Sequence, residues 1–264
     1  MRPLVILPKV GELTQGAIFN CLRINNGANA FGLIVSARCD IVQSKCRTIL
    51  CLPIFPLKRW MEEVGNAEVL DQAGKQIESI SATLVEKYGM AGDSLEVYGF
   101  DAVIAVLMNK NVAKGDLDRL TQFKPYLVDK KLDFRIKAIK DAHSKILDLL
   151  WRNQRADTHF IERIHPNEQA TGYVIDFNQP ITQYREVLDE ISLGLERYIY
   201  ERGVDGKYSN LDLGQLDQGE IVSILQSPFI EHVLQRFTHY YSRIGTKDIS
   251  KEDLKNLKGI YEIS

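Results

Sequence analysis

Three consecutive phrases decide the fold: GAIFNCLRI at residues 16–24, AFGLIVSA at 30–37 and RTILCLPIF at 47–55. Each phrase is rich in β-branched and aromatic residues, and turn-forming polar residues separate one phrase from the next. Such runs predict strands, because branched and aromatic side chains pack well on a pleated surface. Short connections favour antiparallel pairing of consecutive strands. We therefore expect a small antiparallel sheet in the first part of the chain.

The pattern becomes helical after Pro56. An apolar stripe with steps of three and four residues predicts a helix that ends near Gly89. Its members are Leu70, Ala73, Ile77, Ile80, Leu84 and Tyr88. Two more helices are expected over residues 94–110 and 116–153, and Pro125 should break or kink the second of them.

The strand period returns at residues 159–165 and 172–177, which predict two further strands. From Tyr184 onward we expect helices again. The first contains Val187, Ile191, Leu195 and Tyr198, the second covers residues 220–244 with an interruption at Ser227-Pro228, and the last begins with a capping box at Ser250.

These changes of period divide the chain into four parts. Residues 1–56 hold the first barrel strands, 57–153 a helical insertion, 154–182 the returning barrel strands, and 183–264 a C-terminal helical region. The predicted fold class is α+β, with a small antiparallel barrel that is split by the helical insertion and followed by C-terminal helices.

Composition limits the classes of function. The chain of 264 residues is 45% hydrophobic and 26% charged, with a formal net charge of −2, so it has no global attraction to nucleic acid or to an anionic membrane. Its first ten residues contain two prolines and lead into a turn instead of a signal-peptide cleavage site. The longest apolar run, residues 102–108, is too short to cross a bilayer. We expect a cytoplasmic protein without membrane contact.

The cysteines and histidines show no metal-binding spacing. Cys21, Cys39, Cys46 and Cys51 include no Cys-x-x-Cys pair, and the five histidines form no paired ligand motif. We expect the cysteines to be small core residues on strands, and the alternative is that one of them is redox-active or catalytic. Phosphate-binding glycine loops and other cofactor motifs are also absent from the sequence, so no cofactor and no metal are predicted.

One candidate site directly follows the second predicted strand. Ser36 is followed by Arg38, Cys39 and Asp40, so a guanidinium, a thiol and a carboxylate lie within five residues at the end of a barrel strand. Arg38 could clamp a phosphate with two hydrogen bonds, and Ser36 could assist in binding. The competing interpretation is that Cys39 is core, Asp40 caps a turn and Arg38 is solvated.

A second candidate lies in the phrase QSPFIEHVLQRFTHYYSRIG at residues 226–245. Helical spacing gives this phrase one apolar face, which predicts a core or interface helix. The flank of that helix carries His232, Arg236, His239 and Arg243, which could bind an anion or nucleic acid, or could simply be solvated. The phrase is similar to phrases in uncharacterised bacterial proteins of defence-type gene neighbourhoods.

The strand phrases also resemble the PemK/MazF-type toxins of bacterial toxin-antitoxin pairs. GAIF at 16–19 is similar to the family's opening Gly-Asp-Ile/Val, GLIVS at 32–36 to its Ala-Leu-Val-Leu-Ser strand, and TILCLPI at 48–54 to its Thr-Val-x-Val-Ala-Pro-Ile strand. GYVIDFNQPITQYREV at 172–187 is similar to the segment in which the family has a strand, a Gln-Ile/Leu-Arg-Thr turn and a helix. The resemblance implies a small SH3-like barrel and cleavage of single-stranded RNA.

The positions that carry the family's chemistry differ in this sequence. The resemblance places the family's arginine at about residues 29–30, which are Asn and Ala, and its threonine or serine at Phe55. The later turn reads Gln179-Pro180-Ile181-Thr182, without its arginine. RNA cleavage needs a base and a group that stabilises the developing phosphorane charge, and neither expected residue is present.

We therefore predict a non-catalytic binding or adaptor protein of a bacterial defence or toxin-antitoxin-like system, with a protein as its partner. The alternative is a metal-independent endoribonuclease with a relocated site at Arg38, Cys39 and Asp40, for which RNA is the substrate. A third hypothesis is a nucleic-acid-binding regulator that acts through His232, Arg236 and Arg243. The sequence leaves the oligomeric state open.

Overall fold

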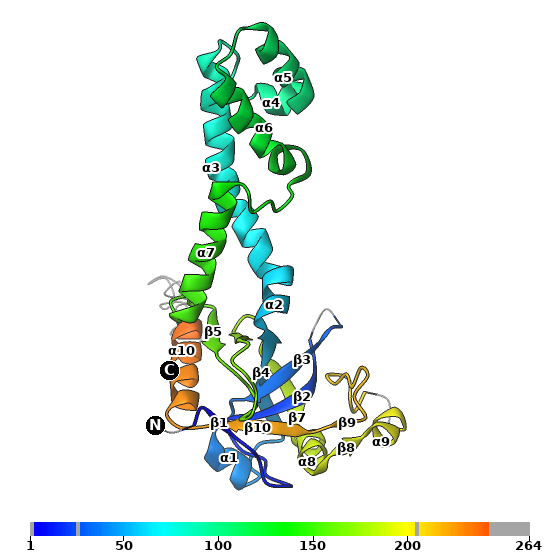
Figure 1. The fold of residues 1–264 in the computed structure, drawn as a ribbon. Coiled ribbons are helices and arrows are strands. Elements are labelled where there is room, and N and C mark those ends of the chain that lie inside the picture. The colour runs from blue at the N-terminus through cyan, green and yellow to red at the C-terminus, as the bar shows by residue number, and fades with distance from the viewer. Residues whose placement is uncertain (1–2, 25–26, 204–205, 243–264) are drawn as a thin grey trace, which may run out of the picture.

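A curled antiparallel sheet and a long helical arm make up the computed structural model, which describes residues 3–24, 27–203 and 206–242 (Figure 1). The sheet order is β1-β10-β2-β3-β4-β6-β5, and β7 pairs with another part of β4. All of these pairs are antiparallel. The strands are β1 (Val5–Ile6), β2 (Ala17–Arg23), β3 (Asn29–Ile34), β4 (Thr48–Pro56), β5 (Thr158–Ile161), β6 (Tyr173–Asp176), β7 (Ile181–Tyr184) and β10 (Ile221–Leu225). The structure confirms the predicted α+β fold with a barrel-like sheet.

Both faces of the sheet are buried, which explains why its strands are almost continuously apolar. On β2, Phe19 and Cys21 face one hydrophobic core, whereas Ile18 faces the other. Gly32 lies opposite Phe19 in the register, and a Cβ at Gly32 would stand 2.2 Å from the Phe19 ring. The Phe19 ring therefore packs directly on the backbone of β3, where a larger residue than glycine would not fit.

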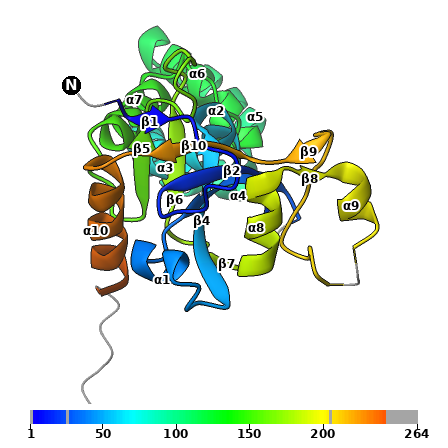
Figure 2. The same cartoon turned by 90° about the horizontal axis from the view of Figure 1, so that it is seen from below.

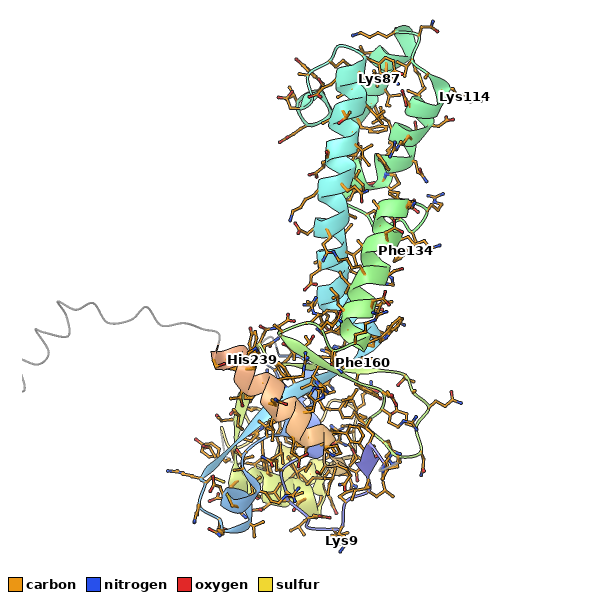
Figure 3. All side chains as sticks on the ribbon, turned by 90° about the vertical axis from the view of Figure 1, so that its left-hand side faces the viewer. Lys9, Lys87, Lys114, Phe134, Phe160 and His239 are labelled. Carbon is orange, nitrogen blue, oxygen red and sulfur yellow. The ribbon has the colours of Figure 1, made fainter. Side chains whose placement is uncertain are left out.

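The helical arm leaves the sheet at the end of β4 and returns to it at β5 (Figures 1 and 3). Its elements are α2 (Leu57–Trp60), the π-helix η1 (Met61–Gly65), α3 (Asn66–Lys87), α4 (Ser94–Tyr98), α5 (Phe100–Asn109), α6 (Lys114–Asp129) and α7 (Lys137–Trp151). In Figure 3, Lys87 and Lys114 lie at the far end of the arm, and Phe160 lies at its base. The sheet-facing core continues along α3 and α7, while a separate small core around Val85, Val103 and Leu107 holds the tip.

Helices cover the two faces of the sheet on opposite sides (Figure 2). Ile230 and Val233 of α10 (Phe229–Ser242) belong to the core of one face, and Val187, Leu188 and Ile191 of α8 (Arg185–Leu193) belong to the core of the other. The remaining elements, β8 (Leu195–Glu196), α9 (Arg197–Glu201) and β9 (Gln218–Gly219), form a small appendage beside α8.

Several predicted helices need correction. Pro125 lies inside α6 without ending it, and the break between α6 and α7 begins at Lys130, whose φ is +49°. The helix expected through Leu195 and Tyr198 ends at Leu193, so these two residues belong to β8 and α9.

The predicted helix over residues 220–244 is also wrong in its first part. Residues Ile221–Leu225 form strand β10, which lies between β1 and β2 in the sheet, and only Phe229–Ser242 form a helix. Part of the C-terminal region thus belongs to the sheet. Strand β10 pairs with β1 and β2, which lie about two hundred residues earlier in the chain. The helix expected at Ser250 lies outside the described residues.

Side-chain amides occupy two edges of the sheet. Asn153 Oδ1 accepts a hydrogen bond from the Phe160 amide at 2.6 Å, and Asn153 Nδ2 donates to the Phe160 carbonyl at 3.2 Å. At β7, Asn210 Nδ2 donates to the Thr182 carbonyl at 3.0 Å, and Gln183 Nε2 donates to the Asn210 carbonyl at 2.9 Å. These groups replace a neighbouring strand, so the edges at Phe160 and Thr182 are closed to strand addition.

Within the described ranges, no helix combines the length and the apolar character that crossing a bilayer requires.

Candidate functional sites

Ser36 forms part of the connection between β3 and β4. Its Oγ accepts a hydrogen bond from the Leu50 amide at 2.8 Å, and its carbonyl accepts one from Gln15 Nε2 at 3.0 Å. The Ser36 hydroxyl and carbonyl are therefore both hydrogen-bonded to neighbouring segments. These bonds fix the place where the following segment leaves the sheet.

Arg38, Cys39 and Asp40 form the start of a short helix, α1 (Arg38–Val42), instead of an irregular loop. The Arg38 side chain is exposed and makes no hydrogen bond or ion pair within the described ranges. The Cys39 thiol is 3.6 Å from Asp40 Oδ1, and the Asp40 carbonyl accepts a hydrogen bond from Cys46 Sγ at 3.6 Å. The three candidate residues are neighbours on this helix, and the one contact between their side chains that the described structure shows is that of Cys39 with Asp40.

The cysteines divide into two kinds. Cys21 and Cys51 are buried strand residues, as expected, and burial raises the pKa of the Cys21 thiol to about 12 and that of Cys51 still further. Thiols of this kind stay protonated and are poor nucleophiles. Cys39 is exposed and Cys46 half-buried, so the expectation that all four cysteines lie in the core is wrong for these two.

The residues that were predicted to share one flank of α10 have different orientations. His232 and His239 are exposed, whereas Arg236 turns inward and donates hydrogen bonds to the carbonyls of Asn153, Arg155 and Thr158, the last at 2.8 Å. Burial lowers the pKa of the Arg236 guanidinium. Arg236 thus fastens α10 to the base of the arm. Arg243 lies outside the described residues.

A polar cluster at the base of the arm was missed by sequence reasoning. Arg155 donates two hydrogen bonds to Glu68, at 2.6 and 3.0 Å, and two to Asp157, at 2.8 and 3.1 Å. Its guanidinium also lies 5.1 Å from the centre of the Trp60 ring. Because Glu68 is on α3 and Trp60 on α2, this one side chain joins the outgoing helices of the arm to the returning chain.

His159, on β5, adjoins this cluster and is 5% exposed. Its ring meets that of His232 edge to face at 5.0 Å, and its Nδ1 is buried without a hydrogen-bond partner in the described structure. Burial, together with the nearby charge of Arg236 and with His232, lowers the pKa of His159 to about 3. His159 is therefore neutral over the physiological range.

A cavity of about 550 Å³ lies where β2, β3 and the start of α2 meet. Arg59 stands at its wall, held by an ion pair with Glu63 at 2.7 Å, by hydrogen bonds to Asn29 and by the Phe55 ring 5.4 Å away. Among the lining residues, Arg59 is the single charged one. The sequence signal that could have found this site is an arginine four residues beyond the third predicted strand phrase, which ends at Phe55.

The tip of the arm contains a larger cavity of about 910 Å³ between α3, α4, the start of α5 and α6. Apolar side chains of Leu95, Phe100, Leu127 and Val128 form much of its wall. The helices around it also expose several large apolar side chains, among them Tyr98 (68%), Met108 (64%) and Val97 (61%).

No group of three or more His, Cys, Asp or Glu side chains in the described structure is arranged to hold a metal ion.

No protein-family model matches the chain, and no curated protein and no solved structure matches it.

Proposed function

We propose that the protein is a non-catalytic binding protein, an adaptor whose helical arm contacts a partner protein. The observation that carries the proposal is that five exposed apolar side chains belong to helices α4, α5 and α6 of the arm. Figure 1 shows these helices in the part of the arm that lies away from the sheet. Exposed apolar groups that gather in one region are typical of interaction surfaces. Those on α4, α5 and α6 are Val97, Tyr98, Val106, Met108 and Val128.

The rest of the molecule supports a contact through the arm. Asn153 and Asn210 close the sheet edges at Phe160 and Thr182, so a partner would gain little by adding a strand there. The ion pairs of Arg155 and the hydrogen bonds of Arg236 join the arm to the sheet and to α10. An arm that is fixed at its base presents its tip in a defined direction, which lowers the entropic cost of binding.

Replacement of two exposed side chains tests the adaptor function. We expect the full chain to co-purify with a partner protein from its own cells, and the double variant Tyr98→Ser/Met108→Ser to lose that partner while keeping its thermal stability. The matched control is Val42→Ser/Tyr198→Ser, which removes exposed apolar side chains from α1 and α9 and should retain the partner. Equal recovery of the partner with both double variants would contradict a contact at the tip.

A second candidate function is RNA cleavage, and one observation favours it. Arg59 lies against Asn29 and Phe55, the positions at which the resemblance to PemK/MazF-type toxins places their arginine and hydroxyl. The cavity beside Arg59 lacks an acidic or basic partner in its lining, so the geometry supports binding better than cleavage. The other proposed site does contain a carboxylate, Asp40, beside the Cys39 thiol, but Arg38 makes no side-chain hydrogen bond or ion pair in the described structure.

An RNA gel assay separates the two candidates. Purified protein and its Arg38→Ala and Arg59→Ala variants are incubated with mixed single-stranded RNA in the presence of a chelator. The adaptor function predicts intact RNA in every lane. Fragments that disappear with one of the two variants would establish a nuclease and would identify its arginine.

The biological setting is proposed from resemblance alone. The strand phrases and the phrase at residues 226–245 support a role in a bacterial defence or toxin-antitoxin-like system. The hypothesis of a nucleic-acid surface on α10 finds less support, because Arg236 binds backbone carbonyls instead of facing solvent.

A further inference from the structure

We propose that the cavity at the tip of the arm binds an amphipathic helix of the partner protein, and that the polar face of this helix is basic. The proposal rests on the adaptor function and names the chemistry of the segment that the arm recognises. Three features of the arm support it: the shape of the cavity, the charges at the rim of the cavity and one buried hydroxyl in its wall.

The shape and the lining fit apolar side chains that enter from outside. The cavity has a volume of about 910 Å³, and its wall includes Leu95, Phe100, Leu127 and Val128. Val128 is 52% exposed, and Val97 and Tyr98, which lie in the chain between the lining residues Glu96 and Gly99, are also exposed. An apolar groove that receives one face of an amphipathic helix is a recurring mode of protein recognition.

The charges at the rim decide the polar face of the occupant. Three carboxylates, Glu78, Asp93 and Glu96, and one ammonium, Lys130, belong to the lining, which gives a local formal charge of −2. Lys130 is committed to Glu78 at 2.8 Å, so its charge is already neutralised. The side chains of Asp93 and Glu96 are exposed and have no ion-pair partner within the described ranges. A ligand with lysine or arginine beside its apolar face would complement these two carboxylates.

Ser81 adds a polar group in the wall of the same cavity. It is 1% exposed, and its Oγ has no hydrogen-bond partner in the described structure. Because a buried hydroxyl without a partner costs free energy, Ser81 would gain from a polar atom at the border between the apolar and the basic face of the bound helix.

A designed peptide pair tests the proposal directly. The probe is an 18-residue helical peptide with leucine on one face and lysine on the other, and its matched control has glutamate in place of every lysine. Binding of the labelled peptides to the full chain is measured by fluorescence anisotropy. We expect the lysine peptide to bind and the glutamate peptide to bind at least about tenfold more weakly, because two rim charges change from attraction to repulsion.

Variants assign the binding to the tip. Asp93→Lys/Glu96→Lys should reverse the preference between the two peptides, whereas Asp141→Lys, an exposed charge change on α7, should leave it unchanged. Val128→Ser should weaken the lysine peptide by about threefold to tenfold, because it removes apolar contact area of the order of one or two methyl groups. Thermal unfolding of each variant verifies that the arm remains folded.

Each outcome has a definite meaning. Equal binding of the two peptides, or a preference that survives Asp93→Lys/Glu96→Lys, would overturn the proposal. Sedimentation that shows a dimer of the full chain, dissociated by Val128→Ser, would identify a second copy as the occupant and would also overturn it. If the Tyr98→Ser/Met108→Ser variant loses its partner while the lysine peptide fails to bind, the adaptor function stands and this inference fails. If the parent chain co-purifies with no partner protein, the adaptor function itself fails.

Discussion

His159→Phe should make the stability of the protein less sensitive to acid. In the folded protein the pKa of His159 is about 3, because its ring is buried beside Arg236 and His232, whereas the ordinary value is 6.5. A base whose folded pKa is depressed binds protons more readily in the unfolded chain, so its stabilising contribution is complete above pH 6.5 and is lost as the pH falls toward 3.

The magnitude follows from these two values. Between pH 7 and pH 5 the unfolded His159 becomes protonated while the folded one remains neutral, which lowers the free energy of unfolding by about 2 kcal/mol. Phenylalanine keeps the edge-to-face contact with His232 and removes the unpartnered Nδ1. The variant should therefore lose about 2 kcal/mol less than the parent over this pH interval.

Urea unfolding at pH 7, 6 and 5, followed by circular dichroism, measures this difference. The control is His143→Phe, which replaces a histidine at a partly exposed position on α7, in edge-to-face contact with Phe134. The control should lose as much stability on acidification as the parent. Parallel curves for the parent and His159→Phe would refute the buried, neutral state of His159 and its contact with α10.

Two further predictions concern the arm. Arg155→Ala should lower the free energy of unfolding by about 3 kcal/mol, because it leaves two half-buried carboxylates unpaired. Lys75→Ala, which removes an exposed ion pair, should leave the free energy of unfolding almost unchanged in the same urea experiment. Gly74→Ala should destabilise the protein by about 1–3 kcal/mol despite the better helix propensity of alanine, because the new Cβ would lie 1.9 Å from Tyr126 Oη. Gly115→Ala, where nothing lies within 4 Å of the new Cβ, should be neutral or stabilise the protein by up to about 1 kcal/mol. Equal thermal shifts for the two variants would contradict the close approach of α3 and α6.

The parts of the fold that sequence patterns could predict are those with strong local signals. Strands β2, β3 and β4 are recognisable because burial on both faces makes them continuously apolar, and α3 is recognisable from its stripe at steps of three and four. Strand β10 could not be recognised in this way. Its five residues precede a helix, and their strand conformation depends on pairing with β1 and β2 at the other end of the chain.

The candidate sites show the same limit. Periodicity placed Arg236 on a flank of α10, but which neighbour covers that flank depends on the return of the chain at Asn153 and Thr158. Arg59 was visible as an arginine after a strand, yet its position beside Asn29 follows from the pairing of β3 with β4. Side-chain roles that depend on long-range contacts need the three-dimensional structure.

A photo-crosslinking amino acid in the full chain tests the central claim most directly. It is introduced at Tyr98 on the tip of the arm or at Val42 on α1, both exposed, and the chain is irradiated in its own cells. The adaptor function predicts one protein adduct from position 98 that is absent from position 42. An adduct from position 42 alone, or RNA in place of protein at either position, would contradict the claim that the arm binds a partner protein.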